Sequence, residues 1–340
     1  MMEIPRLSIC IPTYNFGQFI GQSLDSVLNQ TRDDMEIVVL DGASQDDTES
    51  VVRSYEKRFS QIRYHRMPAR GGIDRDMARS VEFARGEYCW LFSADDIMRP
   101  GAIDRIFSEI ESGLDLYLCG LNLCTFDMHI LRQHSILNIN QDAEFDLGDV
   151  RDRLRYFRYA VTTTAFFSFM GSLIVKRSRW MATPLNEAFV GSLWAHVARI
   201  FEMIPEGLRV KYISAPLLDK RSDNDSFMDK GIVHRCGIVV DGYHRLAESF
   251  FGKGSKEAFH IRRVVRNEFP ALYLLNIKLQ AWEQGKYDEL PVVDQMMRRA
   301  FQDRTLGNYA SRLAYEATPR QVLRIATRVY KSLKRIAGVR

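Results

Sequence analysis

The sequence has no apolar stretch long enough to cross a lipid bilayer. A membrane-spanning helix needs about 20 consecutive apolar residues. The best candidate, residues 165–175, is shorter than this and contains two serines and a glycine. The first six residues lack a basic segment followed by an apolar core, so no secretory signal peptide is predicted. We therefore expect a cytoplasmic protein without a transmembrane helix.

Cysteine is scarce, and the five cysteines do not form a recognisable set. Their number is odd, and no Cys-x-x-Cys pair occurs. Cys10, Cys89 and Cys119 lie within apolar, strand-like runs. This pattern fits buried free thiols in a reducing compartment better than disulfides or a zinc site.

Two familiar phosphate-binding loops are missing, and the excess of positive charge is small. No Gly-x-Gly-x-x-Gly follows the first apolar run, and no Gly-x-x-x-x-Gly-Lys occurs, which excludes the usual dinucleotide-binding and P-loop signatures. A net charge of +4 over 340 residues is too small to indicate a nucleic-acid partner. Any bound phosphate must therefore be neutralised by a metal ion or by basic side chains.

The sequence does contain short apolar runs that alternate with helical patterns. Strands are predicted at residues 7–12, 36–41, 62–66, from 86 onward, 114–124, 166–175 and 216–219. Helices are predicted at residues 19–30, 48–58, 73–84 and 149–159, and from about 196 to 203. Strands and helices that alternate with short connections predict an α/β fold, with a mainly parallel sheet flanked by helices.

Beyond residue 229 the sequence becomes helical throughout. Amphipathic helices are predicted at residues 233–251, 256–280 and 291–301. We therefore expect a domain of residues 1–228 and a helical C-terminal region of residues 229–340. Residues 320–340 contain no acidic residue and place one apolar stripe among arginines and lysines. Such a helix suits the surface of an anionic membrane, although a helix docked on the protein with a basic outer face has the same pattern.

Candidate ligand groups follow three of the predicted strands. Thr13 and Tyr14 follow the first strand, Asp41 ends the second, and Asp95 and Asp96 follow the strand that starts near residue 86. The carboxyl ends of parallel strands share one edge of a sheet, which is where ligands bind in open α/β folds. Carboxylate oxygens suit Mg²⁺ or Mn²⁺ better than zinc. The simpler alternative is an Asp-Asp turn that only caps a helix.

Four motifs in this part of the chain resemble those of a known family. They are Pro12–Asn15, Asp41–Thr48, Ala84–Tyr88 and Ser93–Asp96. In this order they are similar to the successive motifs of family 2 glycosyltransferases, which have the GT-A fold. Gly72–Asp76 and Tyr88–Leu91 most resemble the abequosyltransferase-type branch of bacterial surface-polysaccharide enzymes.

The resemblance implies a nucleotide-sugar site at the sheet edge. Pro12, Thr13 and Tyr14 would line the nucleoside pocket, with Tyr14 against the base, and Asp41 would accept a hydrogen bond from the base. The segment that completes the pocket in relatives corresponds here to Asp74, Arg75 and Asp76. Its arginine could offset phosphate charge, although a solvated helix face explains the same residue.

The resemblance also implies a metal site at the aspartate pair. Asp95 would contact the ribose, and Asp95 and Asp96 would hold the Mn²⁺ or Mg²⁺ ion that bridges the diphosphate. A divalent cation stabilises the charge that develops on a leaving diphosphate. Many relatives have aspartate where this chain has Ser93, so fewer charged ligands are available to the cation.

Later segments supply candidates for the acceptor side. Relatives commonly carry a Glu-Asp pair that provides the catalytic base, but the corresponding segment here ends in His196 and has no acidic pair. We take His196 as the base, since its ordinary pKa is near neutrality, and Glu187 as the second candidate; a packed histidine is the simpler reading. Arg221, in a loop that resembles the family's diphosphate-covering loop, is the predicted phosphate contact, although a plain polar loop explains the same residues.

These features predict a metal-assisted and inverting glycosyltransferase. The donor would be a nucleotide-sugar, and the acceptor a hydroxyl of a glycan, including a lipid-linked glycan at the inner membrane face. A nucleotidyltransferase would also use a carboxylate pair and a metal, but the expected basic, glycine-rich N-terminal loop is missing. A catalytically silent protein that binds nucleotide-sugars or glycans is the third alternative.

Overall fold

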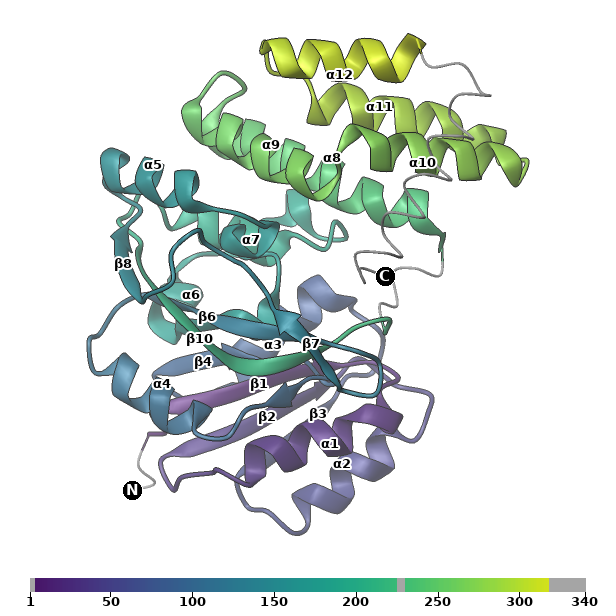
Figure 1. Cartoon of the computed structure of the whole chain (residues 1–340). Coiled ribbons are helices and arrows are strands. Elements are labelled where there is room, and N and C mark those ends of the chain that lie inside the picture. Colours follow the sequence, from purple (N-terminus) through teal and green to yellow (C-terminus); the bar gives the residue numbers. More distant parts are fainter. Residues whose placement is uncertain (1–3, 225–229, 318–340) are drawn as a thin grey trace. The chain divides into compact units, whose positions relative to one another are not determined.

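The computed structural model describes residues 4–224 and 230–317 of the chain (Figure 1). Contacts divide the chain into two compact units, Met1–Asp225 and Ser226–Arg340. The predicted boundary between residues 228 and 229 falls in a segment outside the described residues. The predicted basic helix at residues 320–340 also lies outside them.

The first unit is built on one sheet whose first half is parallel. Its strands lie in the order β3-β2-β1-β4-β9-β6-β10-β5. The parallel half consists of β1 (Leu7–Thr13), β2 (Met35–Asp41), β3 (Ile62–Arg66) and β4 (Tyr88–Leu91). These four strands confirm the alternating strand and helix pattern predicted for the first hundred residues.

The second half of the sheet is mixed. β9 (Leu173–Lys176) lies antiparallel between β4 and β6 (Leu116–Cys124), and β10 (Arg209–Arg221) runs parallel to β6. Three short strands add antiparallel pairs: β5 (Ile97–Met98), β7 (Ile130–Gln133) and β8 (Ala143–Asp146).

The strand predicted at residues 166–175 is wrong over most of its length. Two 3-10 turns, η1 (Thr163–Phe166) and η2 (Met170–Ser172), precede the short strand β9. The physical reason lies at Phe167, whose φ of 64° is left-handed and cannot continue an extended strand.

Helices cover both faces of the parallel half (Figure 1). Right-handed crossovers place α1 (Gly17–Leu28) and α2 (Thr48–Glu56) on one face, because β1, β2 and β3 follow one another outward. α3 (Ile73–Phe83) returns the chain to β4 and packs on β1 and β2 from the other face. The remaining helices of this unit are α4 (Ala102–Ile110), α5 (Val150–Tyr159), α6 (Arg177–Ala182) and α7 (Ala195–Glu202).

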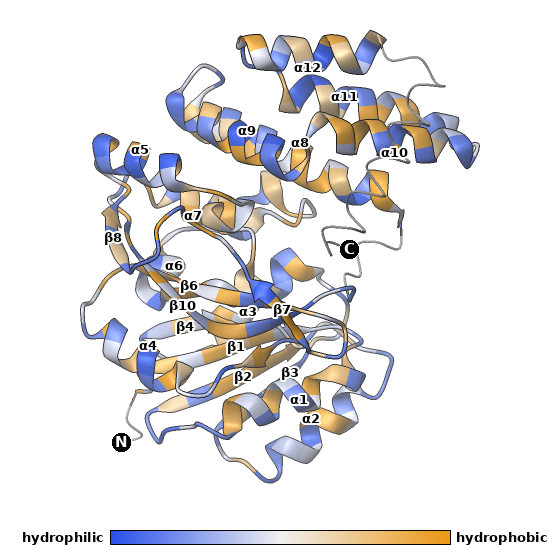
Figure 2. Ribbon diagram, in the orientation of Figure 1, coloured by the Kyte–Doolittle hydropathy of each residue, from blue (hydrophilic) through white to orange (hydrophobic). Residues whose placement is uncertain are grey.

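The core lies along the central strands. Every residue of β1 and β2 is buried, and Figure 2 shows the apolar residues gathered on the strands. The five cysteines are buried and free, as predicted. The α/β fold class with its flanking helices is likewise confirmed.

The second unit is helical. It contains α8 (Ile232–Phe251), α9 (Lys256–Glu268), α10 (Ala271–Glu283), α11 (Leu290–Ala300) and α12 (Leu306–Ala317), with the short turn η5 (Tyr287–Glu289) before α11. The single helix predicted at residues 256–280 is two helices, because Pro270 caps the start of α10 and ends the preceding pattern. None of the helices in residues 4–224 and 230–317 is sufficiently long and apolar to span a bilayer.

One buried carboxylate ties three strands together near their amino ends. Glu36 on β2 is 2% exposed and accepts hydrogen bonds from Ser8 Oγ at 2.8 Å, Arg63 Nη1 at 3.1 Å and Arg85 Nε at 3.0 Å. Burial alone would raise the pKa of Glu36, but the bonds from Arg85, Ser8 and Arg63 outweigh burial and lower it. Glu36 therefore stabilises the fold as a carboxylate.

We expect Glu36→Gln to lower the free energy of unfolding by about 1–3 kcal/mol at pH 7. The folded pKa lies below the ordinary value of 4.5, so this stabilisation is present above pH 4.5 and is lost as the pH falls through the folded pKa. Urea unfolding at pH 7 and below pH 4 should show the difference from wild type shrinking. Glu111→Gln, at a side chain that is 66% exposed, is the control and should cost less than about 0.5 kcal/mol. Equal losses in both variants would contradict the assignment.

Candidate active site

The predicted site residues meet where β1 separates from β4. β1 pairs with β2 along its whole length, from Leu7 to Thr13, but with β4 only as far as Cys10. Because the chain goes from β1 outward to β2 and β3 and then returns to β4, this is the switch point of the parallel half. Ligands of open α/β sheets bind at such points, outside the carboxyl ends of the strands.

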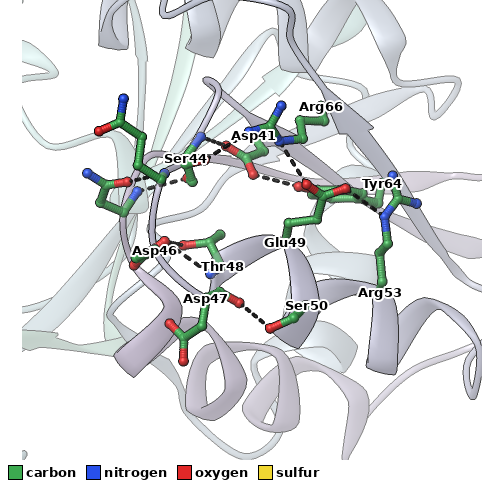
Figure 3. Close-up of polar contacts among 12 residues, drawn as sticks. Asp41, Ser44, Asp46, Asp47, Thr48, Glu49, Ser50, Arg53, Tyr64 and Arg66 are labelled. Atoms are coloured by element: carbon green, nitrogen blue, oxygen red, sulfur yellow. Dashed lines mark hydrogen bonds and ion pairs between the residues drawn. The ribbon is translucent and has the colours of Figure 1, made fainter.

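Asp41, at the end of β2, organises the turn that follows it (Figure 3). It has no exposed surface. Its Oδ1 accepts a hydrogen bond from the Ser44 amide at 2.7 Å, and its Oδ2 accepts one from the Tyr64 hydroxyl at 2.5 Å. Burial and this bond raise the pKa of Tyr64. Tyr64 was not predicted as a site residue, because a tyrosine within strand β3 carries no sequence signal of its partner.

Charged side chains support the same turn from outside. Glu49 on α2 pairs with Arg66 at 2.9 Å and with Arg53 at 2.9 Å, and Arg66 also donates to the Ser44 carbonyl at 2.9 Å (Figure 3). The predicted hydrogen bond between Asp41 and a nucleobase stays a prediction. What the structure establishes is that Asp41 fixes the turn beside the predicted base site.

Tyr14 presents its ring to a cation. The guanidinium carbon of Arg70, in the loop between β3 and α3, lies 4.0 Å from the centre of the Tyr14 ring. Such contacts are worth about 0.5–1 kcal/mol at exposed sites, so a stacking base could displace the arginine at little cost. Next to Tyr14, Pro12 and Thr13 end β1, and Thr13 Oγ1 is buried without a hydrogen-bond partner.

The first turn of α3 contains three of the predicted nucleotide residues, and two of them bind protein instead. Asp74 is 5% exposed and accepts hydrogen bonds from the backbone amides of Gly191, Leu193 and Ala195. Arg75 forms a two-pronged ion pair with Glu187, at 3.1 and 2.7 Å. Asp74 and Arg75 therefore contact the segment of residues 187–195, and their nucleotide contacts stay predictions.

Asp76, in the same turn, has a carboxylate oxygen without a hydrogen-bond partner. It is 4% exposed, and its Oδ1 has no hydrogen-bond partner. A Cβ at Gly42 would lie 2.6 Å from Asp76 Oδ2, and one at Gly71 would lie 2.5 Å from Oδ1, so both glycines are needed to admit the carboxyl group. Burial raises the pKa of Asp76 to about 6, with Arg79 and Arg70 opposing the shift and Asp41 adding to it.

The aspartate pair occupies the loop after β4. Asp95 accepts hydrogen bonds from Ser93 Oγ at 2.5 Å and from Asn224 Nδ2 at 2.8 Å. Asp96 is 2% exposed, and its Oδ1 accepts from the Arg221 amide at 2.9 Å while its Oδ2 has no partner. Burial, followed by the charge of Asp95, raises the pKa of Asp96 well above its ordinary value.

This geometry fits a divalent cation that is held only in part by protein. An unsatisfied buried carboxylate oxygen next to a second carboxylate is a suitable hard ligand set. Across the described parts of the chain, however, no cluster of three or more His, Cys, Asp or Glu could hold a metal ion. A cation at Asp95 and Asp96 would therefore need oxygen atoms from a substrate or from water.

Arg221, the predicted phosphate contact, is a buried structural residue. It is 6% exposed. Its guanidinium donates to the Asp95 carbonyl at 3.0 Å, to Gln22 Oε1 at 2.8 Å and to the Phe126 carbonyl. β10 extends to residue 221, which carries this side chain into the protein rather than into the following loop. Contact between Arg221 and a phosphate stays a prediction.

The two candidate bases lie in different surroundings. His196, in the first turn of α7, is 5% exposed; its Nε2 lies 3.0 Å from the Phe167 carbonyl, and its Nδ1 has no partner. Burial lowers the pKa of His196, whereas Asp74 and the backbone carbonyls of Phe167 and Ser168 raise it. Glu187, by contrast, is 66% exposed and holds Arg75 with both oxygens.

Comparison with known proteins decides the family. Residues 8–173 match the model of glycosyl transferase family 2. Abequosyltransferase RfbV of Salmonella typhimurium is 32% identical over 272 residues, which cover 78% of this chain and 82% of the relative. The chain belongs to glycosyl transferase family 2. It is therefore a glycosyltransferase, and the nucleotidyltransferase alternative is set aside.

Other family 2 relatives share less of their length. A Campylobacter jejuni enzyme, GalNAc(5)-diNAcBac-PP-undecaprenol beta-1,3-glucosyltransferase, is 26% identical over 198 residues, covering 57% of this chain and 60% of the relative.

Solved structures support the GT-A fold. S. aureus TarS 1–349 in complex with UDP-GlcNAc is 16% identical with a TM-score of 0.62, covering 96% of this chain and 92% of that one. Mannosyltransferase PcManGT of Pyrobaculum calidifontis, in complex with GDP-Man and Mn²⁺, is 19% identical with a TM-score of 0.51, covering 96% and 86%.

We expect Asp76→Asn to stabilise this transferase at neutral pH. The folded pKa of about 6 exceeds the ordinary value of 3.8, so the native state binds the proton more tightly and wild-type stability falls as the pH rises from about 4 to about 6. Asparagine does not titrate and avoids this loss, which amounts to at most about 3 kcal/mol. Urea unfolding at pH 4 and pH 8 measures it: the variant should gain only at pH 8. The same advantage at both values would mean that the charge of Asp76 is not what destabilises the fold.

Proposed function

We propose that this enzyme transfers a hexosyl or deoxyhexosyl group from a nucleoside-diphosphate sugar to a hydroxyl of a lipid-linked glycan in the synthesis of a bacterial surface polysaccharide. Transfer inverts the anomeric carbon and is assisted by Mn²⁺ or Mg²⁺. The names of the Salmonella and Campylobacter relatives support this class of reaction. The enzyme works in the cytoplasm at the inner face of the cell membrane, with residues 1–228 as the catalytic domain.

One observation carries the proposal: of the fifteen buried side-chain atoms that lack a hydrogen-bond partner in the described residues, four belong to predicted site residues. These atoms are Thr13 Oγ1, Asp76 Oδ1, Asp96 Oδ2 and His196 Nδ1. Buried polar atoms in folded proteins nearly always have a hydrogen-bond partner, so such atoms call for an explanation. A substrate that reaches from the nucleoside end to the acceptor end of the site would provide partners for all four.

The nucleotide half of the reaction uses the ends of β1, β2 and β4. Tyr14 stacks on the base in place of Arg70, Thr13 contacts the nucleoside, and Asp76 binds the base edge beside Asp41. The diphosphate lies at Asp95 and Asp96. Lys220, whose Nζ lies 4.8 Å from the centre of the Phe169 ring, replaces Arg221 as the cation for the phosphates.

The proposed metal ion binds together with the diphosphate of the donor. Asp95 and Asp96 would hold it, and when bound it would neutralise the charge that develops on the leaving nucleoside diphosphate. A structural neighbour was solved with GDP-Man and Mn²⁺. Because Ser93 occupies the position of a third carboxylate, affinity for Mn²⁺ should depend strongly on the nucleotide.

The acceptor half uses His196 as general base. Donation of Nε2–H to the Phe167 carbonyl leaves the lone pair of Nδ1 free. Burial keeps the imidazole neutral by lowering its pKa. Nδ1 removes the proton of the acceptor hydroxyl while the hydroxyl oxygen bonds to the anomeric carbon and the bond from that carbon to the diphosphate breaks. Glu187 is less suited, because both of its oxygens accept hydrogen bonds from Arg75.

A thermal-shift panel of UDP, GDP, CDP and dTDP, each with and without Mn²⁺, tests the donor site. One nucleotide should raise the melting temperature, with a stabilisation of about 2.7 kcal/mol at 100 times its dissociation constant, and Mn²⁺ should increase the effect. Asp96→Asn should abolish the Mn²⁺-dependent part while keeping the nucleotide-dependent part. If no nucleotide shifts the melting temperature, the proposed donor class is wrong.

Release of nucleoside diphosphate in the presence of membrane glycolipid extract tests the role of His196 as the general base. His196→Gln keeps an amide N–H for the Phe167 carbonyl but has no basic nitrogen, so transfer should fall about 10²–10⁴-fold. Glu187→Gln should stay within a few-fold of wild type. Nucleotide binding, measured by the same thermal shift, should persist in both variants. Full transfer by the His196→Gln variant would remove His196 from the mechanism.

A further inference from the structure

We propose that Asp74 is the positioning residue for His196: from α3, it caps α7 and holds the segment before it, so that the imidazole faces the acceptor. This inference rests on the proposed function, because it concerns the proposed base. It also reassigns Asp74, which the sequence suggested as a nucleotide ligand.

The contacts of Asp74 go to one short segment of backbone. Oδ2 accepts hydrogen bonds from the amides of Gly191 at 2.8 Å and Leu193 at 3.0 Å, and Oδ1 accepts one from the amide of Ala195 at 3.2 Å. Asp74 lies more than a hundred residues away in the sequence and on a different helix. One buried carboxylate therefore accepts hydrogen bonds from the backbone amides of every second residue in the segment just before His196.

The helix that carries His196 depends on this external cap. The N-cap residue of α7 is Trp194, whose side chain makes no capping hydrogen bond; Ser192 Oγ accepts from the amide of Trp194 itself at 3.2 Å. The first amides of a helix have no partner within the helix, and Asp74 supplies one to Ala195. A carboxylate at a helix N-terminus is also favoured by the helix dipole.

The segment held by Asp74 has a strained backbone. Gly191 has a φ of 83° and Leu193 has a φ of 71°. The left-handed conformation suits glycine but is costly for leucine, because its Cβ crowds the following carbonyl oxygen. A conformation of this kind persists only when its surroundings enforce it, and the bonds to Asp74 Oδ2 are made by these two residues.

His196 is held from two sides. Its own helix start is fixed by Asp74, and its Nε2 contacts the carbonyl of Phe167, a residue with a φ of 64°. The groups that act on the imidazole charge are Asp74 from α3 and the carbonyls of Phe167 and Ser168, all of which raise the pKa of His196 against the larger effect of burial. Arg199 on α7 itself stacks over Trp180 at 4.8 Å.

The same turn of α3 also reaches the nucleotide side. Asp76 lies two residues after Asp74 and fits under Gly42 and Gly71 beside Asp41. Arg75, which lies between them in the sequence, forms an ion pair with Glu187. The first turn of α3 thus connects the nucleobase end of the site to the segment that carries His196. A donor bound at the nucleobase end can therefore stabilise the position of the general base.

Asp74→Asn separates this role from a nucleotide contact. The variant keeps the side-chain shape but removes the charge, which disfavours the imidazolium and should lower the pKa of His196 further. We expect kcat to fall about tenfold or more through misplacement of the base, while the nucleotide-induced thermal shift stays as in wild type. The acid limb of the kcat/KM profile should move to lower pH.

A substrate-free measurement keeps this test independent of the proposed function. Titration of ¹⁵N-labelled imidazoles by NMR, with the His196 signal assigned by its loss in His196→Gln, reads the pKa of His196 directly. Asp149→Asn is the matched control, because Asp149 caps α5 by accepting from the Asp152 amide at 2.8 Å. It should change neither kcat nor the pKa of His196. Absence of transfer by wild type would contradict the proposed function and leave the titration result standing.

The remaining outcomes decide the inference. If Asp74→Asn leaves kcat and the titration of His196 unchanged, or weakens nucleotide binding without altering the titration, the positioning role is wrong. If Asp74→Asn does not fold, Asp74→Glu replaces it: this variant keeps the charge but displaces the oxygens. Reduced kcat with intact nucleotide binding then supports the role, and unchanged kcat overturns it.

Discussion

The separation of β1 from β4 beyond Cys10 is the constraint on which the rest of the site depends. Were these strands paired to their ends, the backbone groups of Pro12, Thr13 and the Ser93–Asp96 loop would be engaged in a continuous ladder. Because pairing stops at Cys10, polar side chains take their places at one edge of an otherwise apolar sheet. Every predicted donor residue lies on this edge or on the helix that faces it.

Acidic residues at this edge serve structure as much as chemistry. Asp41 fixes a turn, Asp74 fixes a backbone segment, and Asp95 accepts from Ser93 and Asn224. A carboxylate in a buried setting is stable only when hydrogen bonds or opposite charges compensate for lost water. Burial raises the pKa values of Asp76 and Asp96, and each has one carboxylate oxygen without a hydrogen-bond partner. These two carboxyl groups are therefore the least compensated by protein contacts.

The sequence predicted the strands better than the side-chain partners. The β-branched run at residues 37–39 favours a buried strand, and a polar residue at the carboxyl end of such a strand is then expected at the sheet edge. The direction of an individual side chain, in contrast, depends on what packs against it from distant parts of the chain. The acceptors of Arg221, Gln22 and the Phe126 carbonyl, could not be predicted because they are far away in sequence. Residues 166–175 were misassigned because an apolar composition does not reveal the left-handed Phe167.

The close approach of two glycines to one carboxyl group has a consequence for substitutions around it. A side chain at position 42 or position 71 would occupy the space of the Asp76 carboxylate. A methyl group at either position would press on the Asp76 carboxyl group, and a shorter side chain at position 76 would remove that restriction. The effects of substitutions at positions 42, 71 and 76 should therefore depend on one another.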